Sequence, residues 1–157
     1  MIREVRAEDN SALADVIRRV LIEFGANKPG FAWQDPSLDC MFESYSAPGH
    51  CYLVAIEDGK LLGGAGIGPL EGDGGARCEL QKMYLLPDAR GRGFGGQIID
   101  RLLDWAKHRY QYCYLETLAS MSAANRLYLH RGFQQLAEPL GCTGHGSCDT
   151  WYGKRLN

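Results

Sequence analysis

A segment rich in glycine and arginine, just past the middle of the chain, has the composition of a phosphate-binding loop. It runs from Leu85 to Gly96 and contains Gly91, Gly93, Gly95 and Gly96 together with two arginines. Glycine accepts unusual backbone dihedrals and lets a ligand approach the backbone closely. The first turn of a helix has free N–H groups and a partial positive charge. A strand before this segment and a helix after it would therefore favour a phosphate or pyrophosphate ligand.

The same segment also satisfies a dinucleotide-binding pattern. Residues 91–96 read Gly-x-Gly-x-x-Gly, and Glu116 follows Gly96 by 20 residues. In that fingerprint, however, the first glycine makes the turn directly after the strand. Here Pro87–Arg90 intervene, and too few residues follow to build a second half of a doubly wound sheet. A nicotinamide-dependent oxidoreductase thus stays an alternative, and the absence of Gly-Lys-Ser/Thr excludes a P-loop.

Composition narrows the class of protein. The chain has 157 residues and a formal net charge of −2, with no basic excess to neutralise a nucleic acid. No apolar run approaches the roughly 18 residues of a membrane span, and the first residues lack the apolar core of a signal peptide. We expect one domain over residues 1–157, no nucleic-acid or membrane partner, and a cytoplasmic location. Without a secretory signal, the six cysteines are expected to be free thiols, with Cys40, Cys51, Cys78 and Cys113 as small buried hydrophobes.

Hydrophobic periodicity and turn residues predict a single mixed α/β domain. The predicted elements are a strand over residues 1–7, a helix from Asp9 or Ser11 to Gly25, a shorter helix over 38–45, strands over 51–56, 61–67 and 78–86, a helix over 93–110, a strand over 112–118, a helix over 122–131, and strands over 133–136 and 149–156. Asp58-Gly59 predicts a tight hairpin turn, and the glycines of the strand that follows indicate a bulge or a close backbone approach. The order β-α-α-β-β-β-α-β-α-β-β indicates a mixed sheet flanked by helices.

Three motifs together resemble the GCN5-related N-acetyltransferase (GNAT) superfamily. Arg90, Gly93 and Gly95 fit its acyl-coenzyme A loop, Gln/Arg-x-x-Gly-x-Gly/Ala. Residues 79–87 resemble the strand that leads into this loop, and residues 124–133 match Ala-x-x-Leu-Tyr-x-x-x-Gly-Phe. The resemblance implies the GNAT fold, with a mixed, mostly antiparallel central sheet. It also implies an acetyl-CoA-dependent N-acetyltransferase that moves the acetyl group to a primary amine of a small molecule or peptide, by direct attack in a ternary complex.

The resemblance also indicates which residues bind acetyl-CoA. The pyrophosphate would lie against backbone N–H groups at the start of the helix, and the pantetheine arm along the preceding strand. The predicted cofactor-binding residues are Met83, Tyr84, Leu85, Arg90, Gly91, Arg92, Gly93, Phe94, Gly95, Gly96 and Asn125. Asn125 is included because many members have an asparagine at the position of Met121, and Asn125 lies one helical turn later.

Three side chains are candidates for proton transfer. Tyr128 matches the family tyrosine near the coenzyme A sulfur, where a phenol can donate a proton to the leaving thiolate. Glu79 precedes Arg90 by 11 residues, as in the histone-acetylating members, and is the candidate general base. His145 is a second candidate base near neutral pH. The structural alternatives are a buried core tyrosine, a surface or paired glutamate and a loop histidine.

The segment Cys142-x-x-His145-x-x-Cys148 has the residue types of a metal site. Structural zinc sites use four protein ligands, and no fourth is visible in this segment. We therefore predict no metal and interpret the segment as part of a loop that shapes the acceptor pocket.

The acceptor is the least determined feature. Its pocket is expected between residues 28–39 and 138–148, and Trp33, Asp35, Asp39 and Glu43 offer an aromatic wall and carboxylates for a cationic amine. A catalytically silent acyl-CoA-binding module on the same fold stays an alternative. Family members are often homodimers, which the resemblance carries to this chain as an expectation.

Overall fold

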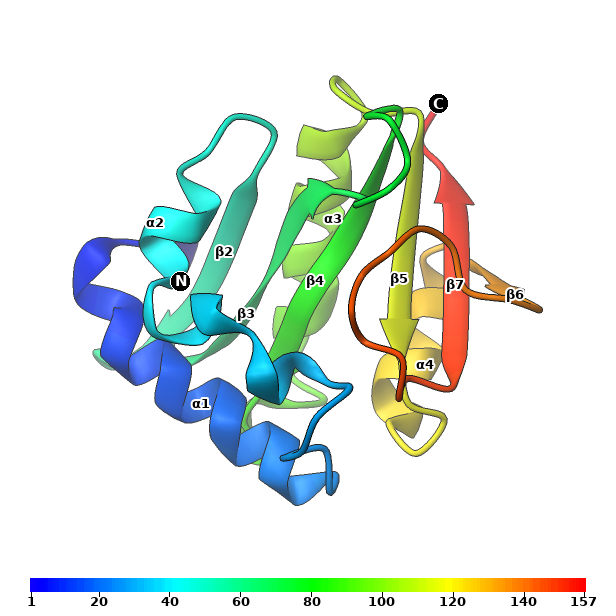
Figure 1. Ribbon diagram of the computed structural model, residues 1–157. Coiled ribbons are helices and arrows are strands. Elements are labelled where there is room, and N and C mark those ends of the chain that lie inside the picture. The colour runs from blue at the N-terminus through cyan, green and yellow to red at the C-terminus, as the bar shows by residue number, and fades with distance from the viewer.

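The chain folds into a seven-stranded sheet with helices on both faces (Figure 1). A computed structural model describes residues 1–157. Its strands are β1 (Ile2–Glu4), β2 (Cys51–Glu57), β3 (Lys60–Pro69), β4 (Arg77–Leu85), β5 (Tyr112–Thr117), β6 (Gln134–Leu136) and β7 (Thr150–Arg155). Its α-helices are α1 (Asn10–Glu23), α2 (Met41–Tyr45), α3 (Phe94–Ala106) and α4 (Ser122–His130).

The sheet opens in its middle. The strand order is β1-β2-β3-β4-β5-β7-β6, and every pair is antiparallel except β4–β5. That parallel pair joins only Arg77–Glu79 to Tyr112–Tyr114, whereas β5 pairs with β7 along its full length. Beyond Glu79 the facing edges of β4 and β5 have no strand partner, so backbone groups there are free to bind a ligand.

Two hydrophobic cores hold the helices to the sheet. Helices α3 and α4 lie behind the sheet in Figure 1, and α1 and α2 lie in front. The core behind contains Ile98 and Leu102 of α3 and Tyr128 of α4, packed with Leu53 and Leu80 of the sheet. The core in front contains Leu13 and Ile17 of α1, packed with Tyr52 and Val54. The long loop between β6 and β7 crosses β5 on the same face as α1 (Figure 1).

The predicted order of elements is confirmed, with local corrections. The first strand covers only Ile2–Glu4. The predicted helix over 38–45 is instead a 3₁₀ turn at Pro36–Asp39 followed by α2, because Cys40 adopts a non-helical backbone (φ −140°, ψ 50°) between them. Helix α3 ends at Ala106 rather than at residue 110. The hairpin turn has positive φ at both Asp58 (49°) and Gly59 (76°), as its sequence predicts.

Two composition-based expectations can also be compared with the structure. No helix has the length and apolar character needed to cross a bilayer. The six cysteines are unpaired; Cys51, Cys78 and Cys113 are buried, but Cys40 is exposed at the backbone break before α2, so its predicted burial was wrong.

Candidate active site

Two cavities meet where β4 and β5 diverge. The first, which we name the loop cavity, lies beside the segment Ala89–Gly96 and has a volume of about 510 Å³. The second, the polar cavity, has a volume of about 550 Å³ and lies between the loop after α1 and the loop before β7. Met83, Tyr84 and Met121 line both cavities, so two ligands bound in them would touch at these residues.

The loop cavity contains most of the predicted cofactor-binding residues. Those that line it are Met83, Tyr84, Leu85, Arg90, Gly91, Gly93, Gly95 and Gly96. Gln97 donates the first hydrogen bond at the start of α3, to the carbonyl of Gly93 at 3.1 Å. The N–H groups of Gly91 to Gly96 are therefore left for a ligand, at the positive end of the helix dipole. Arg126 of α4 also lines this cavity and adds positive charge that the sequence motif does not include, and so does Arg131, directly after α4, which pairs with Asp100 at 3.0 Å.

Glycine has a structural role at two positions of this loop. Gly93 caps α3 with a left-handed backbone (φ +87°), which other residues adopt only with strain. At Gly95 a Cβ atom would lie 3.0 Å from Leu127 Cδ2 and 3.1 Å from Met83 Cε. Helix α3 thus approaches β4 and α4 as closely as it does because residue 95 has no side chain.

Three predicted cofactor-binding residues do not line the loop cavity. Arg92 forms an ion pair with Glu57 at 2.6 Å, and Phe94 packs toward the core under the Arg92 guanidinium. Asn125 lies outside the lining of the loop cavity, and its buried Oδ1 has no hydrogen-bond partner. Its amide group donates to the carbonyls of Leu118 (2.9 Å) and Met121 (2.8 Å), so it fixes the loop between β5 and α4.

A β-bulge arranges the floor of the polar cavity. Gly66 pairs with Gln81 and Gly64 with Tyr84, so β4 has one residue more than β3 between these pairs. Lys82, with φ +47°, takes up the difference. Side chains alternate along a regular strand. The bulge breaks this alternation, so that Gln81 and Lys82 both line the polar cavity, while Met83 and Leu85 pack toward the core behind the sheet.

The glycines of β3 make room for two tyrosines that support this bulge. A Cβ at Gly66 would lie 2.5 Å from the ring of Tyr52 and 2.7 Å from the ring of Tyr45. Both rings therefore cross β3 at a residue without a side chain. The Tyr45 hydroxyl donates to Gln81 Oε1 at 2.7 Å, and the Tyr52 hydroxyl donates to the carbonyl of Lys82 at 2.7 Å.

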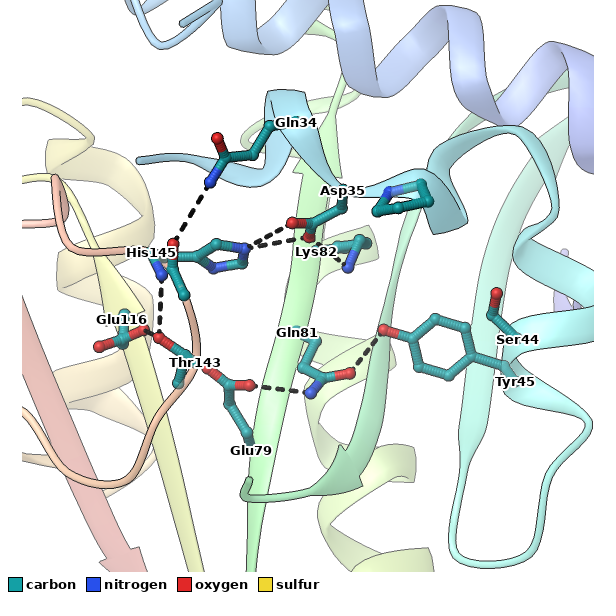
Figure 2. A network of polar contacts seen from close by, with 12 residues as sticks. Gln34, Asp35, Ser44, Tyr45, Glu79, Gln81, Lys82, Glu116, Thr143 and His145 are labelled. Atoms are coloured by element: carbon teal, nitrogen blue, oxygen red, sulfur yellow. Dashed lines mark hydrogen bonds and ion pairs between the residues drawn. The ribbon is translucent and has the colours of Figure 1, made fainter. Parts of the chain in front are cut away.

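Glu79 lies at the last position where β4 pairs with β5, and 7% of its surface is exposed. Gln81 Nε2 donates to its Oε1 at 2.8 Å, which extends the chain of contacts from Tyr45 (Figure 2). Burial raises the pKa of Glu79 to about 7, and nearby Glu116 acts in the same direction. A carboxylate with this pKa can both accept and release a proton near neutral pH.

Asp35 joins two cationic side chains from distant parts of the chain (Figure 2). His145 Nε2 lies 3.0 Å from both Asp35 oxygens, and Lys82 Nζ lies 2.9 Å from Oδ2. Burial favours the neutral imidazole, but the hydrogen bond and charge of Asp35 outweigh it and raise the pKa of His145. Burial would likewise raise the pKa of Asp35, but His145 and Lys82 lower it further than burial raises it. The contact with Asp35 thus favours the charged form of His145 over the neutral form that a general base needs.

Tyr128 of α4 lines the polar cavity and is 4% exposed. Its ring packs against Phe133 and Tyr152, at centroid distances of 6.0 and 5.8 Å. Burial raises the pKa of Tyr128 well above the usual value for a phenol, so the hydroxyl keeps its proton at neutral pH. Tyr128 packs in the core and also lines the cavity, so a structural role and a role as proton donor are compatible.

Both loops predicted to shape the acceptor pocket line the polar cavity, but few of the named side chains do. Asp35, Thr143, His145 and Cys148 line it. Asp39 instead pairs with Arg18 on the surface, Glu43 accepts a hydrogen bond from Asn10, and Trp33 packs against the core in front of the sheet. His145 faces Asp35, and no group of three His, Cys, Asp or Glu side chains is arranged to hold a metal.

Sequence reasoning did not select Gln81, Lys82 or Glu116, which all line the polar cavity. Glu116 accepts hydrogen bonds from the hydroxyls of Tyr114 (2.8 Å) and Thr143. One signal was present for the first two: Gln81-Lys82 is a polar pair within a strand of otherwise alternating pattern, which indicates a bulge.

Comparison with known proteins agrees with this geometry. The profile of the acetyltransferase (GNAT) family matches residues 17–133. The uncharacterized N-acetyltransferase YjgM of Escherichia coli (strain K12) is 43% identical over 152 residues, which cover 95% of this chain and 90% of YjgM. The L-amino acid N-acyltransferase MnaT of the same organism is 27% identical over 136 residues, which cover 83% of this chain and 76% of MnaT.

The fold is shared with a solved acetyltransferase. An aminoglycoside 6'-N-acetyltransferase complexed with coenzyme A has a TM-score of 0.73 and 17% identity, over 100% of this chain and 97% of that one. Together with the family match over residues 17–133, these similarities assign the chain to a family. It belongs to the GNAT family of acetyltransferases, which use acetyl-CoA as the acyl donor.

Proposed function

We propose that the chain transfers an acetyl group from acetyl-CoA to a primary amine by direct attack in a ternary complex, with Glu79 as general base and Tyr128 as general acid. The observation that carries this proposal is the meeting of the loop cavity and the polar cavity at Met83, Tyr84 and Met121. Acetyl-CoA in the first cavity would present its thioester to an amine in the second. Glu79 and Tyr128 both line the cavity in which the amine would lie.

The proposed chemistry needs three proton transfers. An amine arrives largely as an ammonium ion, and Glu79 removes one proton, directly or through a water molecule. The free amine attacks the thioester carbonyl, and collapse of the tetrahedral intermediate breaks the C–S bond. Tyr128 donates its proton to the departing sulfur, and the proton lost from the new amide nitrogen returns, directly or through water, to the Tyr128 phenolate, so that the reaction balances. No covalent enzyme intermediate is required.

The loop cavity would hold coenzyme A through groups that the fold leaves available. The free N–H groups from Gly91 to Gly96 suit the pyrophosphate. Arg126 and Arg131 line the same cavity and add positive charge. The edge of β4 over residues 83–85 faces the opening toward β5 and has no strand partner there, so it can hydrogen-bond the pantetheine arm.

Thiol release from acetyl-CoA with a panel of amines tests the proposal. The panel begins with L-amino acids because the relative MnaT is an L-amino acid N-acyltransferase. We expect release that depends on one class of amine and an N-acetylated product in the mass spectrum. Binding of coenzyme A without turnover on any amine would favour the silent binding module instead. In a thermal shift, stabilisation by NAD rather than by coenzyme A would favour the oxidoreductase.

Replacing Tyr128 by phenylalanine is expected to lower kcat at least tenfold and to leave the KM for acetyl-CoA nearly unchanged. The variant keeps the buried ring and loses only the proton that we assign to the leaving thiolate. Tyr152→Phe is the matched control, because Tyr152 is a neighbouring buried tyrosine that lines neither cavity. Steady-state kinetics with saturating amine measure the effect. Equal kcat values for Tyr128→Phe and the wild type would remove Tyr128 from the mechanism.

A further inference from the structure

The cluster of Asp35, Lys82 and His145 has more hydrogen-bond donors than acceptors. The Lys82 side chain is only 10% exposed, and Asp35 is its single ion-pair partner. An ammonium group has three N–H donors, and Asp35 is the only acceptor that contacts Lys82 Nζ, which leaves two donors for a ligand in the polar cavity that Lys82 lines. His145 binds the same carboxylate through Nε2, which leaves Nδ1 without a partner. Two cationic groups thus share one carboxylate inside a cavity.

The fold directs Lys82 into this position at a cost. Its left-handed backbone (φ +47°) is uncommon for a residue with a long side chain and is strained. The Tyr52 hydroxyl holds the Lys82 carbonyl at 2.7 Å, so the bulge is fixed by a contact from β2. Strained backbone conformations persist where contacts from the surrounding structure hold them. Here the strained backbone turns the Lys82 side chain toward the polar cavity instead of toward the core behind the sheet.

The other side of the cavity has the opposite character. Glu79 and Glu116 line it, and neither forms an ion pair. Their hydrogen-bond partners are neutral: Gln81 for Glu79, and the hydroxyls of Tyr114 and Thr143 for Glu116. In Figure 2 these two carboxyl groups lie on one side of the network and the Asp35 cluster on the other. One end of the polar cavity therefore has two carboxyl groups without an ion pair. The other end has N–H donors of Lys82 and His145 without a protein acceptor.

We infer that Lys82 and His145 form a carboxylate-binding site, so that the acceptor is a small amino acid. Its carboxylate would lie against Lys82 and His145, and its amine would point to Glu79. This inference rests on the proposed function, because it assigns the acceptor to the same reaction. Leu21, Ala26, Phe31 and Ala32 also line the cavity and give it an apolar wall. That wall fits an apolar side chain on the amino acid.

The test compares acceptors that differ only in the carboxylate. L-Leucine, L-methionine and L-phenylalanine are each assayed beside the primary amide and the decarboxylated amine of the same side chain. We expect kcat/KM for the best amino acid to exceed that of its amide and amine by about 10- to 100-fold, because a hydrogen bond to a charged group contributes about 1.5–3 kcal/mol. Amides of amino acids have less basic amines, which favours their reaction, so the expected preference over the amide cannot come from amine basicity.

Lys82→Met is expected to remove most of this preference, because the side chain keeps a similar length and loses its charge. Lys82→Arg keeps the positive charge and is expected to keep the preference. Lys60→Met, at an exposed lysine of β3, is the matched control and is expected to behave as the wild type. If Lys82→Met is unfolded by circular dichroism, His145→Gln replaces it, with the same expected loss of preference.

The outcomes separate this inference from the proposed function. Equal kcat/KM for amino acid, amide and amine in the wild type would overturn the carboxylate site and leave the acetyltransferase intact. A preference that survives in both Lys82→Met and His145→Gln would also overturn it. Thiol release with other amines but with none of the three amino acids would overturn it as well. No thiol release with any amine would contradict the proposed function itself.

Discussion

The Glu79→Gln variant is expected to turn over about 100-fold more slowly than the wild type at pH 8. The substitution keeps the shape of the side chain, and its amide oxygen can still accept the hydrogen bond from Gln81, but it cannot take a proton from the amine. Loss of a positioned general base typically costs 10²- to 10⁴-fold. In the wild type, kcat/KM should rise with pH through an inflection near 7, because burial raises the pKa of Glu79 to about 7. The inflection should be absent from the variant.

The same variant should be more stable than the wild type at pH 8. The pKa of Glu79 is raised from 4.5 to about 7 by folding, so the folded state binds the proton more tightly than the unfolded chain. The stability this provides is complete below pH 4.5 and is lost as the pH rises through 7. Glutamine does not ionise, so the variant does not lose stability at this position as the pH rises. A shift of this size corresponds to about 3 kcal/mol at pH 8, and the difference should fall to about 1 kcal/mol or less at pH 5.

Urea denaturation at both pH values and the pH dependence of kcat/KM measure these effects. Glu79 is faced by Glu116 from β5, by Lys82 and Gln81 from its own strand, and by His145 from the loop before β7, which all remain in the variant. Glu138→Gln, at an exposed glutamate that lines neither cavity, should change neither measurement. An unchanged pH profile together with an unchanged stability would show that Glu79 is neither buried with a raised pKa nor the base.

Elements and loops with local signals could be predicted from the sequence. The helices follow from apolar residues at helical spacing, and the hairpin follows from Asp58-Gly59, because both depend on residues close in the chain. The glycine-rich loop before α3 follows from its composition and from the family resemblance, whereas the opening between β4 and β5 and the left-handed backbone of Gly93 are findings of the structure. The general place of the loop cavity therefore follows from residue order and motif spacing alone.

Side-chain directions do not follow from the sequence in the same way. The motif includes Arg92 and Phe94, but their side chains turn to Glu57 and to the core. The cluster around Asp35 joins residues 35, 82 and 145, and no local pattern relates positions so far apart. Its formation depends on a bulge that moves Lys82 to the other face of β4, and a one-residue change of register moves every following side chain to the opposite face.

Replacing Gly95 by leucine is expected to weaken acetyl-CoA binding more than 100-fold. Even a Cβ atom at this position would lie 3.0 Å from Leu127 and 3.1 Å from Met83, so a longer side chain must extend into the loop cavity or push α3 away from β4. Either movement displaces the N–H groups that we assign to the pyrophosphate. Gly95→Ala should have a much smaller effect, because the two neighbouring atoms are ends of flexible side chains and can shift by a few tenths of an ångström.

The comparison with Gln97→Leu separates loss of the site from loss of the fold. Gln97 lies on the exposed side of α3 and does not line the loop cavity, so the same apolar side chain there should leave the Kd for acetyl-CoA within about twofold of the wild type, as expected for a surface substitution. Overpacking at Gly95 typically costs 1–3 kcal/mol, which a folded domain of this size can withstand. Isothermal titration with acetyl-CoA gives the affinity, and circular dichroism gives the fold. A folded Gly95→Leu protein with undiminished affinity would place the pyrophosphate elsewhere, because a cofactor held at the start of α3 cannot share that space with a leucine.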